Sequence, residues 1–488
     1  MLLHDRTALL QKPVRLRVVG KYLGQLLLVM AVLSFVPLTA SLIFTEYDLS
    51  LRFIIVEIIL LTAGLPLVRI SASTDIQTSE GLVITGLIFT LSPLIMTIPI
   101  MGNGLDFIDA LFETVSAFTT TGLSVATELQ QQPLTFLFAR AYMQWIGGLG
   151  IVVLTIALLP RPGAYLRKLI ELDERSDFVS SAHTYARRIL AIYLVLTGIC
   201  TGLIWIAEGN FFNAVTHAFS AVSTGGFSNF DNSLAGFHSP FSAISVILGC
   251  IFGALPLLLY FHIRQQRFSV IYRDVQVRAI LVLFLLISLP LTWVLMHDLQ
   301  MTFHEAFFHA PLMVISAQTT AGFASIDITQ IGAHGMLILM MAMFTGGALG
   351  STAGGIKLYR MLIFWQAFSY LLKKATATPH AVILPRLAGK NLETDEINKA
   401  LLVILLFIFT ITCAWLVFLF SGYQPLAALF EVVSATATVG LSSGITDIDL
   451  PTHLKLTLCL CMLLGRLEFF ALLVLVYPLT WVNRRSKA

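Results

Sequence analysis

The amino-acid sequence predicts an all-α integral membrane protein with four pseudo-fourfold repeats, each a helix, a re-entrant helix and a second helix, preceded by two extra N-terminal transmembrane helices. Three observations support this fold class. The 488-residue chain is 57% hydrophobic and only 12% charged, apolar segments of spanning length follow one another along it, and one polar pattern recurs four times. A soluble protein of this size lacks the polar surface needed to cover so many apolar side chains.

Ten apolar segments are about as long as, or longer than, the roughly 20 residues that a helix needs to cross the hydrocarbon core of a bilayer. They cover residues 19–44, 53–68, 82–100, 134–159, 189–207, 241–261, 280–296, 336–372, 400–420 and 456–481. Lys and Arg gather at both chain ends and in every second connection, whereas the other connections are acidic. The positive-inside rule therefore places both termini in the cytoplasm. The first segment has no small-residue cleavage site, so we expect it to remain as a helix.

Four connections on the acidic side are unusually long and begin with apolar runs that are too short to span a membrane. They cover residues 101–133, 208–240, 298–335 and 421–455. Such runs are typical of re-entrant helices, and in each of them Ser-Ala begins six residues before an aligned glycine. The repeat divides the chain into two N-terminal helices at 1–72 and repeats at 73–162, 180–265, 275–376 and 395–488.

The four glycine turns, defined as the three residues that end at each aligned glycine, have the composition of a cation-selectivity filter around a central pore. Rings of backbone carbonyls replace the hydration shell of a monovalent cation, and glycine visits the required conformations cheaply. The turns contain no carboxylate, which disfavours a divalent-selective ring. One Ser/Thr/Gly cluster is more often helix packing, but four matched copies favour a filter. The candidate residues are Thr120, Thr121, Gly122, Thr224, Gly225, Gly226, Thr320, Ala321, Gly322, Thr438, Val439 and Gly440.

With these four turns the chain resembles the TrkH/TrkG/KtrB family of bacterial potassium transporters, and its TrkH-type members most closely, over essentially the whole length. The stretches 346–357 and 462–470 add to the resemblance. It implies potassium uptake across the inner (plasma) membrane, potassium bound at the turn residues, a homodimer, and a cytosolic nucleotide-binding regulatory subunit of the TrkA kind. Sodium-selective relatives tend to carry serine at the first aligned position, so Gly122 points to potassium. No organic cofactor is implied.

The apolar segment 336–372 is too long for one span, and five glycines near its centre predict a break in the helix. The resemblance implies an intramembrane loop that closes the cavity below the filter; a static kink is the alternative. An arginine inside the last span, Arg466, is expensive against lipid. By resemblance it lies in the permeation path, whereas the structural alternative is an ion pair with Glu468 or a re-entrant-helix acid. The candidate gate residues are Gly346, Gly347, Gly350, Ser351, Thr352, Gly354, Gly355, Lys357 and Arg466.

Two glutamates, Glu113 and Glu431, occupy matching places in re-entrant helices, where they either hydrogen-bond the backbone of a neighbouring filter or tune cation entry. We favour the structural role. His217 and His309 are more often satisfied core histidines than proton relays. Gly147, in a Gly-Gly pair, is expected to serve helix packing.

Three other functional classes are less consistent with the sequence. A membrane enzyme needs a nucleophile, a base or a metal set, and no such cluster occurs, so we expect no enzyme. A rocking secondary transporter predicts inverted repeats, whereas these four share one orientation, and a scaffold needs no matched glycine turns. A sodium- or proton-coupled symporter of the same fold stays open. The basic connections 161–188 and 373–399 are either docking surfaces for the regulatory subunit or plain positive-inside topology.

Overall fold

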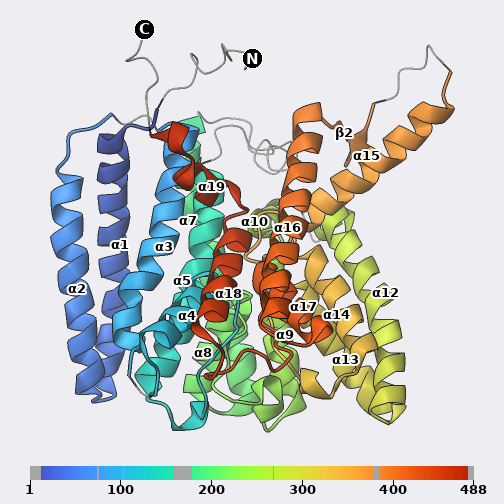
Figure 1. Cartoon of the computed structure of the whole chain (residues 1–488), viewed down its shortest axis with the longest axis horizontal. Coiled ribbons are helices and arrows are strands. Elements are labelled where there is room, and N and C mark those ends of the chain that lie inside the picture. The colour runs from blue at the N-terminus through green and yellow to red at the C-terminus, as the bar shows by residue number, and fades with distance from the viewer. Residues whose placement is uncertain are drawn as a thin grey trace. The chain divides into compact units, whose positions relative to one another are not determined.

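The computed structural model of the protein describes residues 13–73, 76–102, 104–158, 178–266, 269–378 and 384–481. Within these ranges the chain is almost entirely helical (Figure 1). It divides into two compact units, one made of Met1–Pro99 with Leu467–Ala488 and the other of Ile100–Arg466. The second unit contains all four glycine turns.

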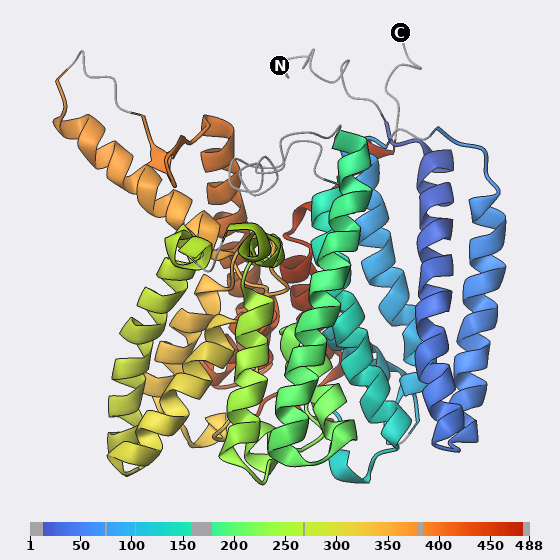
Figure 2. The same cartoon turned by 180° about the vertical axis from the view of Figure 1, so that it is seen from behind.

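The first unit is built around a closely packed pair of helices, which lie side by side in both views (Figure 1 and Figure 2). A Cβ atom on Gly24 would lie only 2.6 Å from Cβ of Leu67, so glycine permits the close approach of the two backbones. The unit contains α1 (Leu16–Ile43), α2 (Tyr47–Val68), nearly all of α3 (Thr78–Ile100), α19 (Phe470–Val476) and the 3-10 helix Pro478–Thr480.

The second unit holds the remaining described helices. They are α4 (Phe107–Phe118), α5 (Leu134–Leu158), α7 (Phe178–Glu208), α8 (Phe211–Val222), α9 (Pro240–Ala254), α10 (Leu257–Gln266), α11 (Ser269–Arg273), α12 (Val275–Asp298), α13 (Phe303–Gln318), α14 (Ala333–Thr345), α15 (Leu358–Thr376), α16 (Thr394–Phe420), α17 (Pro425–Thr436) and α18 (Thr452–Arg466), with 3-10 helices at Leu129–Gln131, Ser233–Gly236 and Ile328–Gln330. A small antiparallel hairpin of β1 (Arg386–Leu387) and β2 (Lys390–Asn391), which the sequence did not predict, precedes α16.

Three of the predicted repeats are visible as mutually packed helix triplets in this unit. The triplets are α7 with α8 and α9, α12 with α13 and α14, and α16 with α17 and α18. In each, the middle helix is the short one that the sequence predicts to be re-entrant. In the first repeat, α4 packs in the same way against α5.

Seven described helices are long and apolar enough to cross a membrane, and an eighth span results if α18 and α19 count as one broken crossing. Three of the ten predicted crossings are split into shorter helices, and one of them is the segment 456–481, which breaks between α18 and α19. The segment 241–261 breaks between α9 and α10, directly before Pro256, because proline cannot continue the hydrogen-bond ladder. The segment 336–372 breaks, as predicted, at the glycine-rich stretch between α14 and α15.

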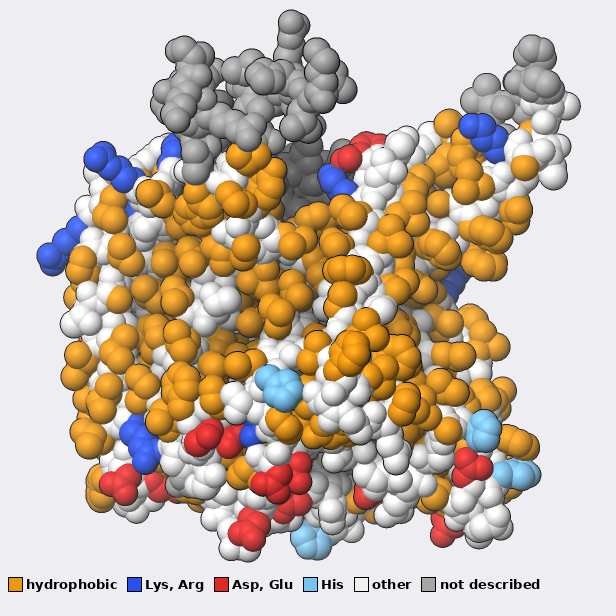
Figure 3. All heavy atoms as spheres, in the orientation of Figure 1, with side chains coloured by type: hydrophobic (Ala, Val, Ile, Leu, Met, Phe, Trp, Pro, Cys, Tyr) orange, Lys and Arg blue, Asp and Glu red, His pale blue; other side chains and the backbone are white. Residues whose placement is uncertain are grey.

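The distribution of side chains is the reverse of that in a soluble protein. Large apolar residues on the long helices are exposed, for example Leu289 at 68% and Phe409 at 66%, while many Ser and Thr side chains of the short helices are fully buried. Figure 3 shows hydrophobic side chains over most of the visible face, with acidic side chains concentrated near one end of the helices. Apolar exposure of this extent requires a lipid environment, so the chain is a multi-pass integral membrane protein.

Candidate functional site

The four short helices α4, α8, α13 and α17 all begin with a defined N-terminal cap or a proline. Asp106 and Asn210 accept hydrogen bonds from the backbone of the first turn, and Thr302 forms a capping box with Glu305. Pro425 takes the first position of α17, where its missing N–H is harmless. These caps fix the residue at which each short helix begins. They therefore also fix the position of its carboxyl end and of the glycine turn that follows.

Each short helix ends in the same backbone conformation. The threonine that starts each glycine turn is left-handed, with φ between 51° and 55°, and the aligned glycine follows with φ between 75° and 94°. The Ser and Ala of the repeated pattern supply the carbonyls that accept the turn's first two N–H groups, at 2.7–3.2 Å. This is a Schellman ending with threonine in the place that glycine usually takes. A left-handed threonine raises the free energy of the folded chain by about 1 kcal/mol relative to glycine. The surrounding structure must therefore stabilise this conformation in all four repeats.

The four aligned glycines form a closed ring with their neighbours. A Cβ atom added to each would collide with the carbonyl oxygen of the residue that precedes the glycine of the next repeat. The added Cβ atom would lie 2.3 Å from the Gly225 oxygen for Gly122 and 2.0 Å from the Ala321 oxygen for Gly226. It would lie 2.0 Å from the Val439 oxygen for Gly322 and 2.1 Å from the Thr121 oxygen for Gly440, which closes the ring. We call this arrangement the glycine ring. It brings together all twelve turn residues predicted from the sequence, and it needs glycine both for positive φ and for space.

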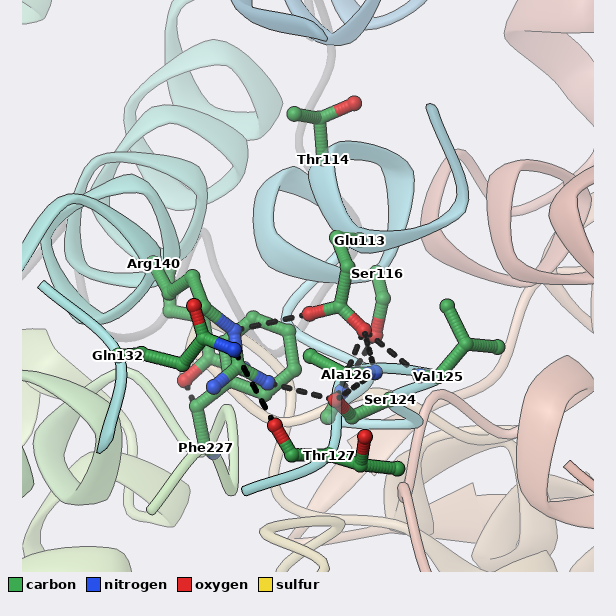
Figure 4. Close-up of polar contacts among 12 residues, drawn as sticks. Glu113, Thr114, Ser116, Ser124, Val125, Ala126, Thr127, Gln132, Arg140 and Phe227 are labelled. Carbon is green, nitrogen blue, oxygen red and sulfur yellow. Dashed lines mark hydrogen bonds and ion pairs between the residues drawn. The ribbon is translucent and has the colours of Figure 1, made fainter. Parts of the chain in front are cut away.

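Behind the ring, one side chain per repeat holds the chain just beyond the glycine. These residues lie nine positions before the ring glycines and are Glu113, His217, Met313 and Glu431. The Glu113 carboxylate accepts the Ser124 hydroxyl and the Val125 N–H, both at 2.7 Å. Figure 4 shows this carboxylate turned toward the segment after the ring glycine on one side and Arg140 on the other.

The partners of the other three residues are equivalent. Glu431 accepts the Ser443 N–H at 2.8 Å, His217 bonds the Ser228 hydroxyl through Nε2 at 3.0 Å, and Met313 Sδ accepts the Ser325 N–H at 3.2 Å. The two glutamates therefore bind their own repeat rather than a neighbouring filter. His217 also bonds a backbone carbonyl through Nδ1, as a satisfied core histidine does, and His309 bonds the Ser325 hydroxyl at 3.1 Å. Sequence reasoning missed Met313, which only its spacing could have indicated.

The first repeat differs from the fourth in its charge balance. Arg140 on α5 donates Nε to Glu113 at 2.8 Å, and both side chains are almost completely buried. The guanidinium also lies 4.0 Å from the ring centroid of Phe227, which directly follows Gly226. Arg140 thus links the supports of the first two glycine turns.

The glycine-rich loop 346–357 lies against the carboxyl ends of three short helices. Thr352 Oγ1 donates to the Val222 carbonyl at 3.0 Å, Gly354 N–H donates to Thr320 Oγ1 at 2.7 Å, and Gly355 N–H donates to the Ala437 carbonyl at 2.9 Å. Positive φ angles at Gly346, Gly350, Gly355 and Lys357 give the loop its irregular path. Lys357 is buried and bonds the Ala353 carbonyl of the loop itself.

Arg466 ties this loop to the first repeat. It is 3% exposed, and its guanidinium donates to the Thr352 carbonyl at 2.7 Å and to the Gly147 carbonyl at 3.3 Å. The loop therefore contacts repeats two to four directly and the first repeat through Arg466. These two bonds go to backbone carbonyls.

A second set of glycines, which sequence reasoning read only as packing or missed, supports the short helices. A Cβ atom on Gly147, Gly253 or Gly465 would lie within 2.2 Å of the carbonyl oxygen of the last residue of α4, α8 or α17, respectively. The spacing after the ring glycines is similar in these three repeats, so the same repeat search could have found them. In the third repeat this place is the start of the loop.

The chemistry of the site is that of neutral oxygen donors. Thr120 and Thr438 hydroxyls are buried and have no hydrogen-bond partner within the described residues, whereas Thr320 accepts from the loop. No group of three or more His, Cys, Asp or Glu side chains that could hold a metal ion occurs within the described ranges. Hydroxyls and carbonyls without carboxylates suit a weakly held monovalent cation better than a divalent one.

Several predicted features lie partly or wholly outside the described residues. Most of the basic connection 161–188 and both chain ends belong to this group. Of the connection 373–399, the described part comprises the end of α15, the hairpin β1–β2 and the start of α16.

A multi-pass membrane protein whose four re-entrant helices close a ring of glycines and carbonyl oxygens belongs to the class of cation-conducting proteins by its architecture. The model of the TrkH family, described as a cation transport protein, matches residues 50–480. The chain therefore belongs to the TrkH family of cation transport proteins, which are transporters and not enzymes, and the resemblance predicted from the sequence is confirmed.

Individual relatives agree along the whole chain. The Trk system potassium uptake protein TrkH of Halomonas elongata is 32% identical over 96% of this chain and 99% of its own length. TrkG of Escherichia coli is 27% identical over 95% of this chain and 98% of its own. The crystal structure of the potassium transporter TrkH from Vibrio parahaemolyticus matches with a TM-score of 0.85 at 26% identity, covering 96% of this chain and all of that one.

Proposed function

We propose that this protein takes up potassium ions across the inner (plasma) membrane through the glycine ring. The observation that carries the proposal is the ring itself, in which four identical backbone turns place one carbonyl each against the next repeat. Such a ring can replace the water of a monovalent cation without fixed charge. The ion would bind among the carbonyls and threonine hydroxyls of the four turns. The names of the relatives, which are potassium uptake proteins, support potassium as the cargo.

We further propose that the loop 346–357 and Arg466 form the gate of this path. The loop bonds the carboxyl ends of α8 and α17 and the threonine that starts the third glycine turn, so it has to release these bonds before an ion can pass. A positive side chain beside the path opposes cation flow until it moves. A cytosolic TrkA-like nucleotide-binding subunit would control this step, and the described basic residues Lys373 and Lys374 at the end of α15 are part of its proposed docking surface. A homodimer with cytoplasmic termini completes the proposal.

Rubidium uptake into proteoliposomes tests the proposed function. The purified chain should accumulate rubidium, and potassium should compete strongly while sodium and lithium compete weakly. A matched negative control is the same liposome without protein. If no uptake occurs, addition of a cognate regulatory subunit with nucleotide distinguishes a closed gate from a wrong proposal, because a closed gate opens and a wrong proposal stays silent. Equal competition by all three ions would contradict the selectivity of the ring.

A further inference from the structure

The second glycine turn is held by a side chain from a different repeat. Gln144 lies on α5 of the first repeat and is completely buried. Its Nε2 donates to the carbonyl of Gly225 at 2.6 Å, and its Oε1 accepts the N–H of Phe227 at 3.1 Å. The two bonds straddle the ring residue Gly226. Gly225 is also the residue whose carbonyl oxygen lies against Gly122 in the glycine ring.

The sequence around Gly225 is explained by this contact. The other three turns carry Thr121, Ala321 and Val439 at the same place, so the ring itself tolerates a side chain there. A Cβ atom on Gly225 would lie 2.4 Å from Cδ and 2.5 Å from Oε1 of Gln144. Gly225 is not among the residues with positive φ, so its backbone conformation does not require glycine. Glycine is required at this position because the Gln144 side chain occupies the space that a Cβ atom would need.

The second turn also lacks a support that two other turns have. In the first and fourth repeats, the hydroxyls of Ser116 and Ser434 accept the N–H of the ring glycine at 3.0 Å. The hydroxyl of Ser220 makes no hydrogen bond within the described residues. Gln144, which belongs to the first repeat, therefore holds the turn of the second repeat in place.

The amide is specific to the first repeat. Gln144 lies three residues before Gly147, and the residues three before Gly253 and Gly465 are Cys250 and Met462, neither of which offers an amide. The four turns are thus alike in backbone but not in support. The ring oxygen of Gly225 accepts a hydrogen bond from a neutral side chain, which fixes its direction.

We infer that Gln144 is a positioning residue that sets the potassium preference of the pore by fixing the carbonyl of Gly225. The inference rests on the proposed function of the glycine ring. Selectivity between potassium and sodium depends on how firmly and at what spacing the oxygens are held. Loss of Gln144 would free the second turn and let the ring adapt to the smaller ion, while the path for either ion stays open.

Substitution of Gln144 by leucine tests the inference, because leucine fills similar space without either bond. We expect the preference for potassium over sodium in rubidium-uptake competition to fall about tenfold, the effect of losing about 1.4 kcal/mol of hydrogen bonding, with uptake retained. The matched control is Thr197→Val, which removes a buried hydroxyl that bonds Trp145, the neighbour of Gln144, at 3.0 Å; its preference should stay at the wild-type value.

A double substitution separates positioning from general destabilisation. Gly225→Ala alone should disturb selectivity strongly because of the collision with Gln144, whereas Gly225→Ala added to Gln144→Ala should cause little further loss. Gln144→Met, which keeps a flexible side chain of similar length and loses the amide donor to Gly225, serves if the leucine variant does not fold, and it too should lower the preference. A wild-type preference in a folded variant, or an equal effect of Gly225→Ala with and without Gln144, overturns the inference. A wild-type chain without potassium preference overturns instead the proposed function.

Discussion

The outer repeats, one and four, differ from the inner repeats, two and three, in how they hold the same backbone. In the outer pair, a buried glutamate and a serine hydroxyl bond the turn from within the repeat. In the inner pair, His217 and Met313 replace the glutamates, and the serine hydroxyls have no hydrogen-bond partner within the described residues. Gln144 of the first repeat bonds the second turn, and the loop 346–357 of the third repeat bonds the third turn. The fourfold symmetry is therefore a property of the backbone, and the side chains behind it are free to differ.

The largest effect is expected at the ring glycines, where outer and inner repeats should respond alike. Serine at Gly122, Gly226 or Gly440 places a Cβ atom within 2.3 Å of a carbonyl oxygen and in a positive-φ conformation. We expect each variant to lose most of its potassium preference, measured by rubidium uptake with potassium and sodium as competitors. Gly198→Ser is the control, because a Cβ atom there meets nothing within 4 Å. A tolerant inner glycine would show that the ring is not equivalent in all four repeats.

The next effect should distinguish the two outer repeats from each other. Glu113→Gln leaves the buried Arg140 without its carboxylate partner, and breaking a buried ion pair from one side costs about 3–5 kcal/mol. Glu431→Gln removes a carboxylate bonded by serine and threonine hydroxyls and one N–H, so the loss should be smaller. Thermal unfolding of the two variants in detergent measures the difference. Equal melting temperatures would mean that the charge of Arg140 is compensated elsewhere.

The first repeat differs from the others in that Arg466 connects it to the loop, through a hydrogen bond to the Gly147 carbonyl. Arg466→Ala removes a charge-assisted hydrogen bond to the loop of the kind that contributes about 1.5–3 kcal/mol. We expect rubidium flux at saturating concentration to rise about tenfold, with the order of ion preference unchanged because the ring is not altered. Arg278→Ala, at a residue whose guanidinium bonds the Tyr272 carbonyl outside the ring and the loop, is the control. An unchanged flux in a well-folded Arg466 variant would assign this residue to structure rather than to gating.

How much of this could be predicted depends on whether a feature is local in sequence. The turns ending at Gly122 and Gly440 and the broken helix at 346–357 follow from residue types that restrict their own backbone. The partners of Gln144 and Arg466 could not be predicted in this way, because each side chain bonds backbone atoms of a different repeat. Every residue has the same backbone groups, so the sequence does not indicate which of them will be the partner. The sequence also did not predict which repeat each ring glycine contacts. Met313 was missed because a thioether is a weak acceptor and reads as ordinary core.

The smallest effect should again divide outer from inner repeats. The hydroxyls of Ser116 and Ser434 each accept the N–H of a ring glycine, so replacing either serine by alanine leaves a buried donor unsatisfied and costs about 1 kcal/mol. The hydroxyls of Ser220 and Ser316 are buried with no hydrogen-bond partner in the described part of the chain, so Ser220→Ala and Ser316→Ala should leave stability unchanged or raise it slightly. Thermal unfolding of all four alanine variants in detergent measures the contrast, and each pair serves as the control for the other. If all four lose the same stability, the hydroxyls act alike and the outer and inner turns are supported in the same way.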